Sequence, residues 1–225
     1  MTRIVACLIA LALLGCGERQ GGDQTVDEAG PETPVESVVR VNPTATMEDA
    51  AALLTSSFAD DCIDREPGEE PMIPDESVDV VLADGRTARL FRMSCALGAY
   101  NSSEVWLRQV GDGQLEALTF RTPEVTYAYA DEDETQLTSP PEVTGFRESN
   151  MLVNSSFDPE SGQINSFIKW RGLGDAWEAG TWTLAGSEFE LTRYVVDPTW
   201  SANAAAEDGT IDETSWEIFP AVRQQ

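Results

Sequence analysis

The hydrophobic positions of this chain fall into three regions with different spacing. An uninterrupted apolar run over 4–14 follows a single basic residue, Arg3. Over 47–58 the apolar residues recur at helical spacing, directly after Thr46, which can cap a helix. From residue 78 onward, apolar and polar residues alternate in short runs that turn residues separate, a pattern typical of strands. The pattern therefore predicts one N-terminal helix followed by antiparallel strands.

The alternating region predicts four hairpins and a closing strand. The strongest signal is Asp84-Gly85, a pair that favours a tight turn between two strands. The predicted strand pairs are 78–82 with 86–95, 104–110 with 114–120, 151–157 with 163–170 and 181–184 with 188–196, and the closing strand is 215–219. Hairpins at this density predict a mostly β fold, either a sandwich or barrel-like. The acidic stretch 131–141 interrupts the strands without a change in composition, so we expect a single domain over 45–225.

The first apolar run is about half as long as a membrane-spanning helix requires, but it fits a signal peptide. It ends in Leu13-Leu14-Gly15-Cys16, which resembles the lipobox of bacterial lipoproteins. The resemblance implies a signal peptide over 1–15, a lipid on the thiol of Cys16 and a flexible acidic tether over 16–44. Because Gly17 rather than Asp follows the cysteine, the resemblance favours attachment to the outer membrane, with the domain facing the periplasm. The alternative is an ordinary secretory signal.

Charge and composition exclude several classes of function. Forty acidic and fourteen basic residues give a net charge of −26. Such a chain is not expected to bind nucleic acid or an anionic lipid surface through charge. It has no histidine, which removes Ser-His-Asp triads, Cys-His dyads and histidine metal sites. The acidic run 131–134 lacks the spacing of a calcium loop, so we expect no metal and no cofactor.

Two cysteines are left once Cys7 leaves with the signal peptide and Cys16 carries the lipid. In an oxidising compartment, Cys62 and Cys95 are expected to form a disulfide that holds the helix against a strand. The alternative is a redox pair, but the Cys-X-X-Cys spacing that lowers the pKa of a thiol is missing.

Two motifs carry a family resemblance. The first is 95–101, which contains Gly98, Tyr100 and Asn101, and the second is 170–175, which contains Arg171, Gly172, Leu173, Gly174 and Asp175. Together they resemble a bacterial envelope family, the domain-of-unknown-function family eleven-seventy-six. The resemblance implies a location in the cell envelope and the fold of the family, but it implies no catalysed reaction. The family usually places a cysteine after the second motif; Ala176 stands there in this chain, and we expect Ala176→Ser to be tolerated on a turn.

The second motif is predicted to form a turn, because a phosphate loop would need a following helix or a lysine.

We expect a lipid-anchored, non-enzymatic binding module that recognises a cationic protein or a cell-wall component. Two alternatives stay open: a carboxylate-based glycan hydrolase, and an inhibitor of a cationic wall hydrolase such as lysozyme. Two carboxylates in one aromatic cleft would favour the hydrolase. Most of the tryptophans should be core; one or two exposed beside Arg171 or Tyr100 would indicate a recognition surface.

Overall fold

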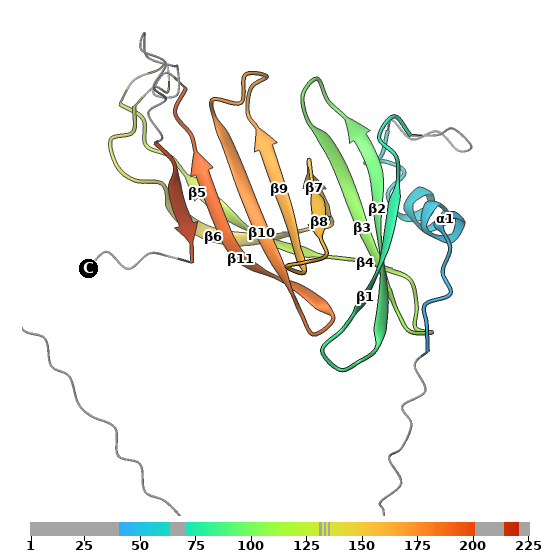
Figure 1. The fold of residues 1–225 in the computed structure, drawn as a ribbon. Coiled ribbons are helices and arrows are strands. Elements are labelled where there is room, and N and C mark those ends of the chain that lie inside the picture. Colours follow the sequence, from blue (N-terminus) through green and yellow to red (C-terminus); the bar gives the residue numbers. More distant parts are fainter. Residues whose placement is uncertain are drawn as a thin grey trace, which may run out of the picture. The chain divides into compact units, whose positions relative to one another are not determined.

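The computed structural model describes residues 41–63, 71–130, 132, 134, 136–200 and 214–220. The predicted signal peptide, Cys16 and most of the tether lie outside the described residues, as do Asp131 and Asp133 of the acidic run. Within the described ranges, one helix and antiparallel strands are present, as the pattern predicts, and the sheets remain open rather than closing into a barrel (Figure 1). No helix in this part of the chain is both long enough and apolar enough to cross a membrane.

Helix α1 (Met47–Ser57) begins at the predicted cap. The Thr46 hydroxyl accepts a hydrogen bond from the Asp49 amide at 3.2 Å, and the Asp49 carboxylate accepts one from the Thr46 amide at 2.8 Å. Two backbone donors of the first turn are thereby satisfied reciprocally. Ala50 and Leu54 are fully buried, so the predicted apolar face of the helix does pack on the core.

The first sheet contains β1 (Glu76–Val81), β2 (Thr87–Leu97), β3 (Ser102–Val110) and β4 (Glu116–Ala117) in this order, and β7 (Met151–Val153) also pairs with β3. Both of its faces are covered. Phe91, Met93 and Leu107 pack with α1 on one face. Leu90 and Trp106 point into the main core on the other. Strand β3 is therefore buried along most of its length.

The predicted disulfide between Cys62 and Cys95 is present, with an S–S distance of 2.05 Å. Cys62 follows α1, and its amide donates to the carbonyl of Phe58 at 2.8 Å. Cys95 lies in β2, and both cysteines are buried. The bridge therefore ties the end of the helix to the first sheet.

The second sheet contains β12 (Trp216–Phe219), β11 (Glu188–Asp197), β10 (Trp177–Ala185), β9 (Gln163–Lys169) and β8 (Ser156–Asp158) in this order. Its inner face contributes Ile164, Trp182 and Tyr194 to the main core. Its outer face carries the ion pair between Arg193 and Glu217 at 2.8 Å and the contact between the Phe167 and Trp177 rings at 5.3 Å. One face buried and one solvated is the usual pattern of an antiparallel sheet.

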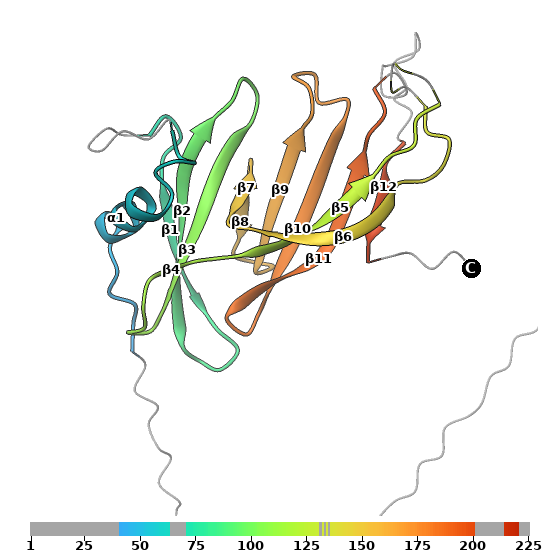
Figure 2. The ribbon, with the colours of Figure 1, turned by 180° about the vertical axis from the view of Figure 1, so that it is seen from behind.

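A two-stranded ribbon, β5 (Phe120–Thr126) and β6 (Glu142–Ser149), crosses the inner face of the second sheet (Figures 1 and 2). Phe120 contacts Trp182 edge-to-face with ring centroids 5.6 Å apart. Phe146 packs against Phe219 in the same way at 5.8 Å. The ribbon therefore covers the main core.

The prediction of the second hairpin is wrong in its return arm. Only β4 pairs back onto β3, and Phe120 begins the ribbon instead. The amide of Leu118 still donates to the carbonyl of Trp106 at 2.8 Å, and Phe120 already pairs with Ser149, so the chain leaves the first sheet between Leu118 and Phe120. Asn150 stabilises this departure, because its side chain donates to the carbonyl of Leu118 at 2.9 Å.

The prediction of the third hairpin is wrong in its first arm. Asn154 adopts a φ of 45° and divides the predicted strand 151–157 into β7 and β8. The first piece pairs with β3 and the second with β9, so the kink transfers the chain from one sheet to the other. Asparagine tolerates this left-handed conformation better than most residues. Strand β6 was not predicted at all.

Candidate functional site

The side chain of Asn101 joins the two sheets. Its amide nitrogen donates to the carbonyl of Lys169 at 2.8 Å, and its oxygen accepts from the amide of Lys169 at 3.1 Å. Asn154 donates to the same oxygen and to the carbonyl of Phe167, both at 2.8 Å. Its own oxygen accepts from the Ser102 amide at 2.8 Å. The start of β3, the kink and the end of β9 are therefore bonded into one unit, which we call the asparagine junction.

A buried carboxylate supports the asparagine junction. Glu104 is 1% exposed, and its carboxylate accepts hydrogen bonds from the amide and the hydroxyl of Ser155, both at 2.8 Å. The hydroxyl of Ser102 donates to the other carboxylate oxygen. Three donors satisfy a polar group that would otherwise be costly to bury. Sequence reasoning missed Glu104, although it shares the core-facing side of β3 with Trp106.

The structure brings the two family motifs together. The hydroxyl of Tyr100 donates to the carbonyl of Trp170 at 3.1 Å. The ring of Tyr100 lies over Gly172, where an added Cβ would stand 3.4 Å from a ring carbon. Within the first motif, the Gly98 amide donates to the carbonyl of Asn101 at 2.7 Å. The motif residues therefore shape one contact between the sheets.

The second motif forms the predicted turn. The Gly174 amide donates to the carbonyl of Arg171 at 2.9 Å, and Gly174 has a φ of 71°. Arg171 forms an ion pair with Asp175 at 2.8 Å and lies over the ring of Trp200 at 4.8 Å. Leu173 is 82% exposed at the tip of the turn. Only Trp106 and Trp182 of the six tryptophans are buried, which is fewer than expected, and Trp170 and Trp200 are half-buried beside this turn.

The expectation for Ala176 is corrected by the structure. This residue lies directly before β10 and is fully buried, and its carbonyl accepts a hydrogen bond from the Trp170 amide at 2.9 Å. A serine hydroxyl there would lose its hydration, which costs about 1–3 kcal/mol when no partner is provided. We therefore expect Ala176→Ser to destabilise the fold rather than to be tolerated.

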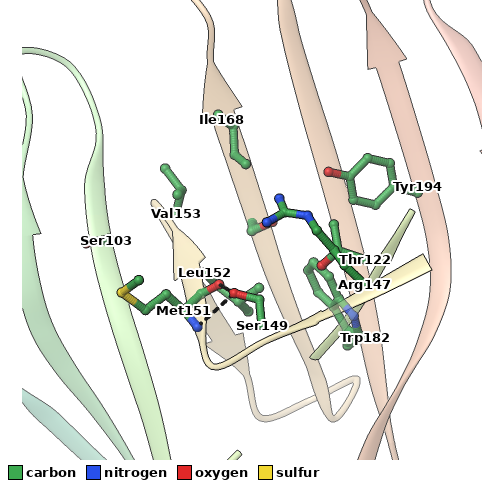
Figure 3. A pocket seen from close by; sticks show the side chains of 11 residues that line it. Ser103, Thr122, Arg147, Ser149, Met151, Leu152, Val153, Ile168, Trp182 and Tyr194 are labelled. Carbon is green, nitrogen blue, oxygen red and sulfur yellow. Dashed lines mark hydrogen bonds between the residues drawn. The ribbon is translucent and has the colours of Figure 1, made fainter. Parts of the chain in front are cut away.

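A pocket of about 200 Å³ lies where the first sheet, the ribbon and the second sheet meet (Figure 3). We call it the Arg147 pocket. Its apolar walls are Met151, Leu152, Val153, Ile168 and Trp182, and its polar residues are Ser103, Thr122, Arg147, Ser149, Ser166 and Tyr194. Figure 3 shows the Arg147 side chain extending from β6 toward the middle of the pocket. Sequence reasoning identified none of these residues as a site.

Local packing fixes the walls of the Arg147 pocket. The indole of Trp182 lies against Gly180, where a Cβ would stand only 2.3 Å from a ring carbon, so no larger residue fits. The indole nitrogen donates to the carbonyl of Arg121 at 2.9 Å, which links β10 to the ribbon. On the other side, the hydroxyl of Ser149 donates to the carbonyl of Met151 at 2.8 Å and holds the turn from β6 into β7.

A titratable pair lies next to the Arg147 pocket. Burial raises the pKa of Glu178 above its ordinary value, while a hydrogen bond from Tyr194 and the charge of Arg147 oppose this rise. Burial, followed by the nearby Glu178 carboxylate, likewise raises the pKa of the Tyr194 hydroxyl. The half-buried Tyr127 is a third titratable group, and the pKa of its hydroxyl is raised by burial first and by Glu178 second.

Residues 19–217 match the model of a protein family described as "Protein of unknown function (DUF1176)". The chain belongs to this DUF1176 family. The match confirms the resemblance on which the two motifs were singled out. A comparison with curated proteins and one with solved structures found no match.

In this DUF1176 chain, the motif residues lie at the asparagine junction and its turn, and the Arg147 pocket lies directly beside the junction. Ser103 and Val153 line the pocket and neighbour Ser102 and Asn154 in the chain. Among the described residues, no group of three His, Cys, Asp or Glu side chains could hold a metal ion. Cys62 and Cys95 belong to the separate core under α1.

The raised pKa of Glu178 predicts how Glu178→Gln changes the pH dependence of stability. Between the ordinary value of 4.5 and the raised value, the folded chain binds more protons at this residue than the unfolded chain does. The contribution of Glu178 to stability therefore falls as the pH rises through this window. We expect Glu178→Gln to become more stable relative to the wild type as the pH rises from about 4 to 7.

Urea unfolding of both proteins across this pH range measures the difference. Glu148→Gln is the matched control, since Glu148 is an exposed glutamate on β6. If the stability of Glu178→Gln relative to the wild type stays constant or falls as the pH rises, burial does not disfavour the charged form of Glu178.

Proposed function

We propose that this DUF1176 chain is a lipid-anchored, periplasm-facing binding module of the bacterial envelope that holds a ligand in the Arg147 pocket. The observation that carries the proposal is the pocket itself, in which a few polar groups converge between apolar walls. This combination is typical of ligand sites. Its volume of about 200 Å³ equals that of about seven liquid waters, which suits a small molecule or the end of a larger one.

The lining of the Arg147 pocket favours binding over glycan hydrolysis. A carboxylate-based hydrolase needs two carboxylates that face each other across the substrate. The eleven described residues that line the pocket include no Asp or Glu. Glu178, which interacts with the charge of Arg147, is bonded to the Tyr194 hydroxyl.

A cell-wall component fits the proposal better than a cationic protein does. The net charge of −26 would steer cationic proteins toward the domain, but this support is long-range and does not define a site. The pocket, in contrast, accommodates a short chain end. A flexible tether over 16–44 would give the domain a reach of about 30 Å from the lipid on Cys16, so that it could meet the wall.

The lipid anchor predicts that Cys16→Ser releases the full-length protein from membranes, because a serine oxygen does not replace the thiol in lipid transfer. Fractionation of cells, followed by a wash of the membranes, measures the release. Cys7→Ser, in the apolar run of the predicted signal peptide, is the matched control and should leave the protein on the membrane. Cys16→Ser protein that stays in the washed membranes would exclude this anchor.

The pocket predicts that Val153→Phe abolishes ligand binding, because a larger side chain on β7 would fill the Arg147 pocket. The full-length protein is extracted from envelopes in mild detergent, and native mass spectrometry detects small molecules bound to it. Val81→Phe makes the same exchange at a position on β1 that is 64% exposed. We expect a bound ligand in the wild type and in Val81→Phe, and none in Val153→Phe. Equal occupancy in all three proteins, or none in any, would contradict a ligand site here.

A further inference from the structure

We infer that the Arg147 pocket recognises a carboxylate group on a short apolar stem. This inference rests on the proposed function and adds the chemical class of the ligand. It is carried by three features of the described residues: an arginine without an ion pair, two hydroxyls that line the pocket without a hydrogen bond to the protein, and an apolar wall beside them.

Arg147 differs from most other arginines that the structure describes. Six of these form ion pairs with a carboxylate: Arg86, Arg89, Arg92, Arg108, Arg171 and Arg193. Arg147 forms no such pair within the described residues, although Glu178 lies within reach of its charge. Arg147 is exposed at the pocket, so its guanidinium is accessible to an anion that enters there. The planar guanidinium matches a carboxylate with two parallel hydrogen bonds.

Two hydroxyl groups of the Arg147 pocket also lack a partner. Thr122 and Ser166 are each only 6% exposed, and both line the pocket. In the part of the chain that the structure describes, no hydrogen bond involves the hydroxyl of either residue. Neither hydroxyl oxygen is among the fully buried polar atoms of the described residues, so both stay open to the pocket. A ligand carboxylate beside Arg147 would offer acceptor oxygens to these donors.

The apolar wall defines the rest of the ligand. Leu152, Val153 and Ile168 line the pocket together with Met151 and Trp182. A volume of about 200 Å³ leaves room for a few carbon atoms beyond the carboxylate. Two sources share this chemistry, namely the C-terminal end of a peptide and a free short-chain acid.

The net charge of the whole chain makes it possible to distinguish an anion bound through contacts in the pocket from one attracted by long-range electrostatics. A net charge of −26 repels anions at long range, and added salt screens this repulsion. An anion that binds through contacts inside the pocket should therefore not be lost when the salt concentration rises from about 50 to 150 mM.

The test measures dissociation constants of four probes for the full-length protein in detergent by saturation-transfer NMR. The probes are hexanoate and N-acetyl-alanyl-alanine, each compared with its own primary amide. We expect at least one acid to bind about tenfold or more tightly than its amide, at both salt concentrations, because a hydrogen bond to a charged group is the stronger. The acid that binds identifies the source as a peptide end or a free acid.

Two variants locate the recognition. Arg147→Gln should abolish the preference for the acid over the amide. The matched control is Arg121→Gln, which removes the same charge from the neighbouring strand, where Arg121 stacks on Phe146 at 3.7 Å outside the pocket lining. Arg121→Gln should retain the preference for the acid over the amide. Thr122→Val, which preserves the shape of the side chain, should weaken binding of the acid about threefold or more through the loss of one donor.

Three results would overturn the inference: acid and amide bind equally, Arg121→Gln abolishes the preference as Arg147→Gln does, or no probe binds at about 10 mM. If no probe binds but native mass spectrometry finds a ligand that Val153→Phe excludes, carboxylate recognition fails while the proposed binding function stands. If neither experiment detects a ligand, both fail.

Discussion

The amide side chain of Asn101 makes the contact on which the rest of the described structure depends. The strands that it connects belong to different sheets, so no ladder of backbone hydrogen bonds holds them together. Asn101 supplies both a donor and an acceptor to Lys169, much as a neighbouring strand would. Asn154 completes the junction at the kink where the chain changes sheets. Leaving any of these partly buried groups without its partner would cost about 1–3 kcal/mol.

The Arg147 pocket is a geometric consequence of the asparagine junction. The junction brings β7 beside β9, and the ribbon then closes over the remaining opening. The family motifs therefore position the pocket without lining it. This arrangement separates two roles: the motif residues hold the sheets, and residues outside the motifs, with Arg147 at the centre, meet the ligand that we propose.

Local signals in the sequence were sufficient for the helix and for most turns. Thr46 and Asp49 determine the start of α1, and Asp84-Gly85 determines the first hairpin. Assignment of strands to sheets could not be predicted, because no glycine or proline marks the kink at Asn154. Strand β6 has few apolar residues and contains Gly145, so its alternation is weak. The pocket combines residues from seven strands or turns, and only the tertiary fold places Thr122 near Ser166.

The central claim is that Asn101 and Asn154 act together to hold the two sheets, and a double-mutant cycle on the free energy of unfolding tests it most directly. The variants are Asn101→Ala, Asn154→Gly and the double variant; glycine keeps the φ of 45° accessible at the kink. The account predicts a coupling energy of at least about 1 kcal/mol between the two positions, and none between Asn101 and the exposed Gln114. Destabilisations by Asn101→Ala and Asn154→Gly that simply add would contradict it.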